Sequence, residues 1–426
     1  MKIEIEGLTD VGRKRDHNED YMLINRDLNM AIVCDGMGGH AAGEVASKLT
    51  TEVINNHIVS NQLVINEFEQ NPSKENAEKV KSLIQEAVVK ACGEVWFEGK
   101  HDENKKGMGT TLVMMIAVGS HAFVAHVGDS RNYLYRQGEV HQITEDHSYV
   151  NEMVKQGLMT REQAEKSPHA NIITRCIGQN EFVQVDILQM ELLDGDRFLL
   201  CSDGLCGYMP DKAFAKIMES EREVPKLPKV FIDFANKKGG KDNITAIVLQ
   251  VGELGNQAQV DNIVRKVQAL KGIPMFKHFD YKEMNKTLEI IKSKDLDSGE
   301  TIITEGSTGE DMFIILDGNV QVHKGNIKMA KLGPGAYFGE MSLIDKVKRS
   351  ATIKTITPCK VMIVERTPLF ALLRKEPRIA MKLFWAFLQN MNRRLRQNDQ
   401  ELADLKKKFL NDTAPEGDDD LAGLMK

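Results

Sequence analysis

The chain has 426 residues, which is enough for two or three domains that each bury a core, and it has a formal net charge of −6 and a pI near 6.1. This mild acidity argues against a nucleic-acid partner and is compatible with clustered carboxylates.

The cysteines and the apolar runs indicate a reducing compartment. No CxxC pair occurs, and several cysteines lie inside apolar runs, so they are predicted to be buried thiols rather than disulfides or zinc ligands. The amino-terminal segment MKIEIEGLTD has no apolar signal core, and no run approaches about 18 apolar residues. We therefore expect a cytoplasmic protein with no membrane contact. The cysteines are Cys34, Cys92, Cys176, Cys201, Cys206 and Cys359.

The first elements in chain order are two strands with a charged loop between them. Lys2–Gly7 alternates polar and apolar residues, as a strand with one buried face does. The segment GRKRDHNEDYMLIN follows, in which Arg15 shortly precedes Asp20 and a second strand. The Arg15 guanidinium could hold a substrate anion, although such a loop could equally be a solvated charged turn.

The stretch AIVCDGMGGHAAG, residues 31–43, predicts a metal-binding edge. Its apolar run ends at Asp35, and Gly36 begins a glycine-rich turn that lets the backbone approach an ion. One Asp-Gly pair is more often an ordinary turn, but other acidic residues occupy similar strand ends. The complete set is Asp20, Asp35, Asp129, Asp203 and Asp242.

The middle of the chain predicts helices packed on antiparallel sheets. Ala41–Ile58 and Ala77–Val95 have apolar residues at helical spacing. A polar helical stretch is expected over Asp146–Lys166. Many strands with few helices between them favour stacked antiparallel sheets with helices on the outer faces. The strands are expected at Thr111–Val118, His121–Val127, Asn132–Arg136, Phe182–Met190, Arg197–Cys201 and Ile244–Val251.

The carboxylates together indicate a hard divalent cation. Oxygen ligands without a His or Cys cluster suit Mg2+ or Mn2+ better than zinc. Two such ions, about 3.5 to 4 Å apart, could hold a bridging water and offset charge on a phosphoryl group during in-line attack. This chemistry would hydrolyse a phosphoester.

The motifs RDHNED, DGMGGH, GMGTTL, GDSRNYLY, EDHS, ITRCIG, SDGL and DNIT occur in this order. Over residues 1–252 they resemble the bacterial form of the metal-dependent type 2C serine/threonine protein phosphatases. The resemblance implies an αββα sandwich, in which two antiparallel sheets are flanked by helices, and phosphoprotein substrates.

The same resemblance implies a role for each site residue. Asp35 would bridge two ions, with the Gly36 carbonyl on one of them and Asp203 and Asp242 on the other. Asp20 would support the water ligands. Asp129 would help to bind a third ion, Arg15 would hold the substrate phosphate, and the segment 146–175 would form a flap beside the cleft.

One position departs from the family pattern. Many eukaryotic members read DGHGG, with the His proposed as general acid, whereas Met37 occupies that place here and His40 lies three residues further on. The leaving alkoxide could be protonated by His40 or by a water ligand. Alternatively, His40 could be a packing or capping residue.

After Gly252 the sequence changes character. A polar linker, GELGNQAQ, precedes a predicted amphipathic helix from Val260 to Leu270, and Tyr281–Ile291 predicts a second helix. From Leu296 to Glu365 short strands alternate with turn signals, which is typical of a small β-barrel or jelly roll.

The stretch GPGAYFGEMSLIDKVKRSATI predicts an anion site. Gly339 opens a helical turn with free N–H groups, Glu340 could accept from ribose hydroxyls, and Arg349 could pair with a phosphate. The stretch resembles the phosphate-binding cassette of cyclic nucleotide-binding domains, although Lys348 replaces the usual proline. Ser350 leaves the choice between cAMP and cGMP open.

The final helical region has an apolar seam at heptad spacing. Its single polar member, Asn398, is of the kind that sets register in a coiled coil. The pairs Arg394 with Asp399 and Glu401 with Lys406 favour a parallel homodimer, whereas a helix folded back on its own domain is the alternative. The seam consists of Met381, Phe384, Leu388, Met391, Leu395, Asn398, Leu402, Leu405 and Phe409.

The sequence thus predicts an α+β protein in several parts. These are a phosphatase domain (1–252), a linker and connecting helix (253–275), a β-jelly-roll cyclic nucleotide-binding domain with flanking helices (276–395), a long C-terminal helix or coiled coil (381–410) and a disordered acidic tail (411–426). The predicted function is metal-dependent serine/threonine phosphatase activity regulated by a cyclic nucleotide.

Several alternatives stay open. The sensor domain could bind another ligand or none, which would leave a constitutive phosphatase. The chain could also be a catalytically inactive nucleotide-binding scaffold. A transcription factor is disfavoured, because only an acidic tail follows the last helix and no helix-turn-helix pattern is present.

Overall fold

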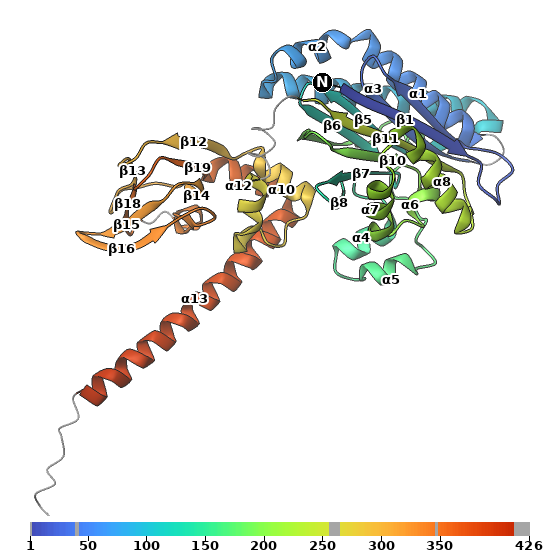
Figure 1. Ribbon diagram of the computed structural model, residues 1–426. Coiled ribbons are helices and arrows are strands. Elements are labelled where there is room, and N and C mark those ends of the chain that lie inside the picture. Colours follow the sequence, from blue (N-terminus) through green and yellow to red (C-terminus); the bar gives the residue numbers. More distant parts are fainter. Residues whose placement is uncertain (1, 39–41, 255–264, 346–347, 413–426) are drawn as a thin grey trace, which may run out of the picture. The chain divides into compact units, whose positions relative to one another are not determined.

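The computed structural model describes residues 2–38, 42–254, 265–345 and 348–412 (Figure 1). The chain divides into two compact units, Met1–Val260 and Asp261–Lys426. Each unit contains its own antiparallel sheets and helices, so the predicted α+β class is confirmed.

The first unit contains two antiparallel sheets in which every strand pair is antiparallel. In spatial order, one sheet consists of β1 (Lys2–Asp10), β11 (Ile244–Gly252), β10 (Arg197–Cys201), β7 (Arg131–Arg136) and β8 (Glu139–Gln142). The other consists of β2 (Asp20–Asn25), β3 (Met30–Met37), β5 (Leu112–Val118), β6 (His121–Val127) and β9 (Asp186–Glu191), with β4 (Gly109–Thr110) paired to β3.

Helices cover the outer face of each sheet, as the αββα expectation requires (Figure 1). On α1, for example, Ala46, Ile54 and Ile58 are fully buried in the core against the second sheet, at the spacing of one helical face. The helices on the second sheet are α1 (Ala42–Ser60), α2 (Gln62–Gln70) and α3 (Lys74–His101). Those on the first sheet are α6 (Asp203–Cys206), α7 (Asp211–Ser220) and α8 (Leu227–Lys237).

Some elements differ from their sequence expectation. The strand expected from Phe182 begins at Asp186, because residues 182–185 make no ladder with β6. The expected single helical stretch 146–166 divides into α4 (Tyr149–Lys155) and α5 (Arg161–Glu165). The helices α2, α7 and α8 were not predicted.

The second unit has two four-stranded antiparallel sheets around a small core. One consists of β12 (Lys292–Leu296), β19 (Cys359–Val364), β14 (Met312–Asp317) and β17 (Tyr337–Phe338). The other consists of β13 (Thr301–Ile303), β18 (Thr352–Thr355), β15 (Val320–Lys324) and β16 (Ile327–Leu332). This is the predicted β-jelly-roll with helices around it.

Its helices form a second core against the first of these two sheets. Residues 265–271 are helical, whereas the start of the helix predicted from Val260 lies outside the described residues. The other helices are α10 (Tyr281–Leu288), α11 (Met341–Ile344), α12 (Arg366–Lys375) and α13 (Pro377–Asp412). Helix α10 thus ends three residues before the predicted Ile291.

Helix α13 buries one face of its first turns and exposes the other. Ile379, Leu383 and Ala386 are at most 3% exposed, and they pack within the second unit. The opposite face presents seam residues to solvent, including Leu388, Leu395 and Leu402, which are 63%, 57% and 55% exposed. The side chain of Phe409, the last predicted seam residue, lies outside the described residues.

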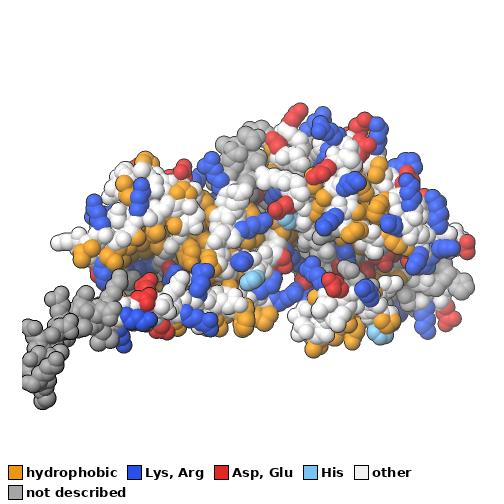
Figure 2. Space-filling model, turned by 60° about the horizontal axis from the view of Figure 1, so that its bottom comes forward, with side chains coloured by type: hydrophobic (Ala, Val, Ile, Leu, Met, Phe, Trp, Pro, Cys, Tyr) orange, Lys and Arg blue, Asp and Glu red, His pale blue; other side chains and the backbone are white. Residues whose placement is uncertain are grey.

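The surface carries charges of both signs. In the space-filling view, Lys and Arg side chains are interspersed with Asp and Glu over the face shown (Figure 2). Among the described residues, no helix combines the length and apolar character needed to cross a bilayer.

Candidate metal centre and nucleotide site

The fold brings the predicted carboxylates together at the ends of strands. Asp20 begins β2 and lies directly opposite Asp35 of β3 in the ladder. Asp203 follows β10, and Asp242 precedes its neighbour β11, so the antiparallel pairing places both at one end of that sheet. Asp35 and Asp203 lie close enough to share a hydrogen bond, and Asp129, after β6, interacts electrostatically with both.

These carboxylates destabilise one another when they are ionised. Burial, with smaller contributions from the nearby Asp203 and Asp242, raises the pKa of Asp20 to about 7. Burial and the charge of Asp203 likewise raise the pKa of Asp129 to about 7. Burial and the charge of Asp20 hold the pKa of Asp35 well above its usual range. Such a cluster needs a positive charge to be ionised at neutral pH.

One carboxylate oxygen of Asp20 is available to bind a cation. Its Oδ2 accepts hydrogen bonds from Ser202 Oγ at 2.7 Å and from Thr245 Oγ1 at 2.6 Å, which fix the carboxylate plane. Its Oδ1 is buried and has no hydrogen-bond partner among the described residues. Because buried polar atoms are normally satisfied, this oxygen fits a cation or a water ligand of a cation. The carboxylate set therefore fits Mg2+ or Mn2+.

Gly36 lies where the backbone is too crowded for a side chain. A Cβ atom there would be 2.1 Å from Gly43 O and 2.5 Å from Glu19 O, so only glycine is compatible with this packing. Glu19 N in turn donates to Asn243 Oδ1 at 2.9 Å. Glu19 is a further carboxyl group at the edge of the cluster, and burial raises its pKa.

Sequence reasoning missed the roles of Glu19, Ser202, Asn243 and Thr245. Each lies inside a motif that was recognised for its aspartate, and its place in that motif was the sequence signal that could have identified it. The hydrogen bonds themselves join residues 182 and 225 positions apart for Asp20, which no local pattern reveals.

Arg15 lies at the rim of the cluster. Its Nη2 lies 2.9 Å from Asp242 Oδ2, and its side chain is 49% exposed. The hydrogen bond to Asp242 raises the pKa of Arg15, and the charges of Glu19 and Asp35 act in the same direction. The guanidinium is thus positioned between the carboxylates and solvent, where an incoming phosphate would arrive.

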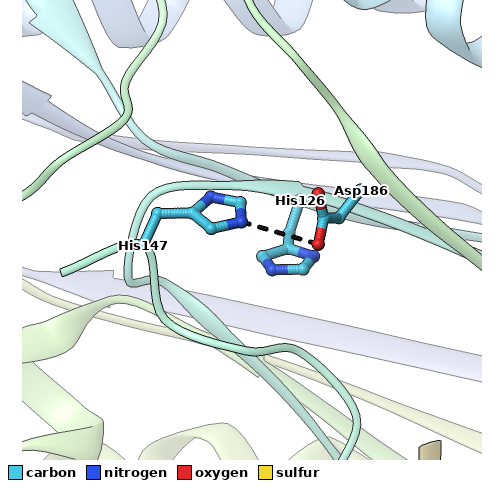
Figure 3. Close-up of side chains that lie close together, drawn as sticks. All are labelled: His126, His147 and Asp186. Atoms are coloured by element: carbon cyan, nitrogen blue, oxygen red, sulfur yellow. Dashed lines mark ion pairs between the residues drawn. The ribbon is translucent and has the colours of Figure 1, made fainter. Parts of the chain in front are cut away.

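A second polar cluster lies near Asp129 (Figure 3). The rings of His126 and His147 stack with centroids 4.7 Å apart, and His147 Nε2 lies 3.6 Å from Asp186 Oδ2. Three such side chains could hold a metal ion, but Arg175 Nη1 lies 3.0 Å from His147 Nε2 and 2.8 Å from Asp186 Oδ1. The guanidinium supplies the positive charge there, so we interpret this cluster as structural.

The cluster fixes both ends of the segment 146–175. His147 N donates to Gly128 O at 2.9 Å, and Gly128 N donates to His147 Nδ1 at 3.0 Å. Thr174 N donates to His147 O at 2.8 Å, which closes the segment on itself. Because Gly128 precedes Asp129, the same contacts hold that carboxylate in place.

One candidate general acid cannot be placed in this geometry. His40 lies outside the described residues, within 39–41. Met37, at the family's histidine position, is the last residue of β3 and is half-buried.

In the second unit the predicted nucleotide-site residues converge on one loop. Arg349 is 8% exposed; its Nη2 donates to Asp311 O at 2.8 Å and its Nη1 to Gly339 O at 3.3 Å. Among the described residues it forms no ion pair, and burial lowers its pKa. Glu340 Oε1 lies 2.6 Å from Arg394 Nη1 of α13, and Ser350 is exposed.

Two family models match separate parts of the chain. Residues 12–246 match the protein phosphatase 2C model, which covers more than half of the chain. Residues 293–376 match the cyclic nucleotide-binding domain model. The chain belongs to the protein phosphatase 2C family. It is a protein serine/threonine phosphatase fused to a cyclic nucleotide-binding domain, which confirms the resemblance found in the sequence.

Individual relatives align with the first unit of this phosphatase. The serine/threonine phosphatase stp of Listeria innocua is 36% identical over 245 residues, which are 57% of this chain and 93% of that relative. The structure of the S. agalactiae serine/threonine phosphatase has a TM-score of 0.52 at 34% identity and covers 59% of this chain and 100% of that one.

A third comparison bears on the metals. The catalytic domain of the phosphatase PstP, solved in complex with two manganese ions, has a TM-score of 0.50 at 31% identity. The match covers 59% of this chain and 99% of that one.

Neutralising one carboxylate should stabilise the metal-free phosphatase. At pH 8, above the pKa of about 7 for Asp20 and Asp129, ionised carboxylates repel one another, so we expect Asp203→Asn to raise the unfolding temperature in excess chelator by roughly 2 to 8 °C. Thermal unfolding followed by circular dichroism measures this. Asp233→Asn, on the solvent-facing side of α8 where Asp233 pairs with the exposed Lys229, is the matched control and should change the temperature by less than about 2 °C. A lower unfolding temperature for Asp203→Asn would contradict the repulsion.

Proposed function

We propose that the first unit hydrolyses phosphoserine and phosphothreonine in proteins with two divalent ions, Mn2+ or Mg2+, held by the carboxylate cluster. The observation that carries the proposal is a buried set of mutually repelling carboxylates, in which Asp20 Oδ1 accepts no hydrogen bond from any residue that the structure describes. The two manganese ions of the PstP catalytic domain support the same metal number.

The ligand assignments are those that the family resemblance implies, and the clustering of the carboxylates supports them. Asp35, which interacts with Asp20, Asp129 and Asp203, is the bridging ligand. The Gly36 carbonyl would bind one ion, and Asp203 and Asp242 would bind the other. Asp129 would help to bind a third ion, in addition to the two of the PstP complex.

The protein side chains position the substrate and water. When bound, divalent ions acidify water and offset charge on the phosphoryl group. Arg15 binds the phosphate dianion at the rim. Ser202 and Thr245 fix Asp20, which orients water within the cluster. His40 is proposed as proton donor to the leaving alkoxide, on its place in the sequence alone.

Two substitutions separate chemistry from binding. We expect Asp35→Asn to lower Mn2+-dependent kcat on a phosphothreonine peptide by at least about a thousandfold, because the bridging ligand is lost. Arg15→Ala should mainly raise KM, by about tenfold, because a rim contact to phosphate is removed. Phosphate release measures both. Wild-type rates in Asp35→Asn would contradict the assignment, and no Mn2+-dependent phosphate release by the wild type would favour a catalytically inactive scaffold.

We further propose that the second unit binds cAMP or cGMP and that binding regulates the phosphatase. The nearly buried guanidinium of Arg349, which donates to two carbonyl oxygens and forms no ion pair with any described residue, fits a cyclic phosphate. The backbone around Gly339 and the exposed Ser350 complete the site.

The pair between Glu340 and Arg394 links this site to α13. Glu340 has an 11% exposed side chain, and its carboxylate already holds the Arg394 guanidinium. Ribose hydroxyls would have to share or displace that partner, so nucleotide binding has a direct route to the helix. A second contact joins α13 to the strand before this site: Asn390 Nδ2 of α13 lies 3.5 Å from Oη of Tyr337, in β17.

Removing Arg349 should abolish the nucleotide response. We expect cAMP or cGMP to change the Mn2+-dependent rate of the wild type, and Arg349→Ala to weaken nucleotide binding by about a hundredfold because its phosphate partner is lost. Calorimetry and phosphate release measure this, and the exposed neighbour Lys348→Ala is the control. An unchanged rate with either nucleotide would instead favour a constitutive phosphatase.

We also propose a homodimer through α13. The supporting observation is that predicted seam residues such as Leu388, Leu395 and Leu402 are exposed on one face of the helix.

We also propose that the phosphatase domain spans residues 1–252, the nucleotide-binding domain residues 276–395 and the C-terminal helix residues 381–410. A cytoplasmic setting is supported by six free, buried thiols.

A charge in the seam should separate the dimer. We expect Leu395→Glu to convert a dimer into a monomer, because a buried carboxylate at an a position is strongly unfavourable. Gln400→Glu, an exposed position of α13 outside the seam, should leave the dimer intact. Light scattering gives the mass directly, and a wild-type monomer at micromolar concentration would exclude the proposal.

A further inference from the structure

Five exposed cations lie on two loops at the rim of the carboxylate cluster. Arg13 and Lys14 lie between β1 and β2, Lys237 is the last residue of α8, and Lys238 and Lys241 lie between α8 and β11. We call these five side chains the basic ledge. The metal and phosphate assignments above do not use any of them.

The two loops form one surface because hydrogen bonds join them. Arg13 N donates to Gly240 O at 2.7 Å. Asn243 Nδ2 donates to Val11 O at 3.1 Å and to His17 O at 2.9 Å. These contacts connect segments more than 220 positions apart in the chain, so the cations are assembled by the fold.

The ledge is also fixed against the metal centre. Gly12 has φ +84°, and a Cβ atom there would lie 2.2 Å from Asp242 O, so the loops pack as closely as a glycine allows. Lys241 directly precedes Asp242, and Lys14 directly precedes Arg15. Arg15 and Asp242 pair at 2.9 Å, which places ledge residues on both sides of the expected phosphate position.

The charge of the ledge is largely uncompensated. Within the described part of the chain, none of the five cations forms an ion pair, and Lys238 lies over the Phe234 ring, 5.8 Å from its centroid. Asp16 is the exposed carboxylate of the first loop. A surface with such an excess attracts anionic groups of a partner and accelerates its association.

We propose that the basic ledge selects phosphoprotein substrates in which aspartate or glutamate flanks the phosphorylated residue. The inference rests on the proposed function, because phosphate at Arg15 is what brings flanking residues to the ledge. An extended peptide advances about 3.3 Å per residue, so acidic side chains a few positions from the phosphate reach these cations. The contacts lie in solvent and therefore weaken with ionic strength.

The test compares two phosphothreonine peptides of equal length, with either glutamate or glutamine at the flanking positions. Full-length protein with Mn2+ should cleave the glutamate peptide with kcat/KM about tenfold higher at low salt, and the preference should shrink at high salt. The triple variant Lys14→Gln, Lys237→Gln, Lys238→Gln should lose the preference through KM and keep its glutamine-peptide rate within about twofold. The matched control is Lys48→Gln, Lys74→Gln, Lys90→Gln, which removes the same charge from α1 and α3.

A second readout separates this proposal from the catalytic one. Binding of both peptides to Asp35→Asn, with and without the ledge substitutions, is measured by fluorescence anisotropy. Equal binding and equal cleavage of the two peptides by the wild-type ledge would overturn the inference, as would the same loss of preference in the matched control. A binding preference for the glutamate peptide, together with no Mn2+-dependent turnover by the protein with Asp35 intact, would support the ledge and overturn the proposed function.

Discussion

Mutual repulsion among buried carboxylates is the constraint on which the first unit depends. Asp20 and Asp35 face each other across β2 and β3, an arrangement in which like charges destabilise a sheet. Burial and neighbouring charges raise the pKa values of both groups. The fold maintains this arrangement with the large buried cores on either side of the two sheets. The repulsion lowers the stability of the metal-free protein, and bound divalent ions would stabilise the folded state.

The surrounding polar groups reflect the same constraint. Ser202 and Thr245 donate to one oxygen of Asp20 only, which leaves the other free to serve a cation. Asn243 ties the loop before β2 to the strand end that follows Asp242, so one side chain positions both sides of the rim. Arg15 pairs with Asp242 at that rim, whereas the cations of the basic ledge form no ion pair with the carboxylates among the described residues and can meet a substrate.

Much of this could be predicted because the chemistry is concentrated in short motifs. Asp35, Asp203 and Asp242 each stand beside glycine or asparagine at the end of an apolar run, and the fold class followed from the number of strands. The helices α7 and α8 could not be predicted, since their polar faces obscure a short apolar pattern. The contact of Arg394 with Glu340 was missed for another reason: heptad spacing assigned Arg394 a partner on a second helix, whereas the structure gives it one in its own domain. Both partners are compatible with the sequence, and only the folded geometry distinguishes them.

The central claim is that protons and divalent ions compete for the same carboxylates. It is tested most directly by titrating Mn2+ into chelator-treated protein in weak buffer at pH 6.5 and counting the protons released. Because the pKa values of Asp20 and Asp129 are near 7 in the metal-free protein, the account predicts release of at least about one proton per chain. Binding of Mn2+ without proton release would contradict it.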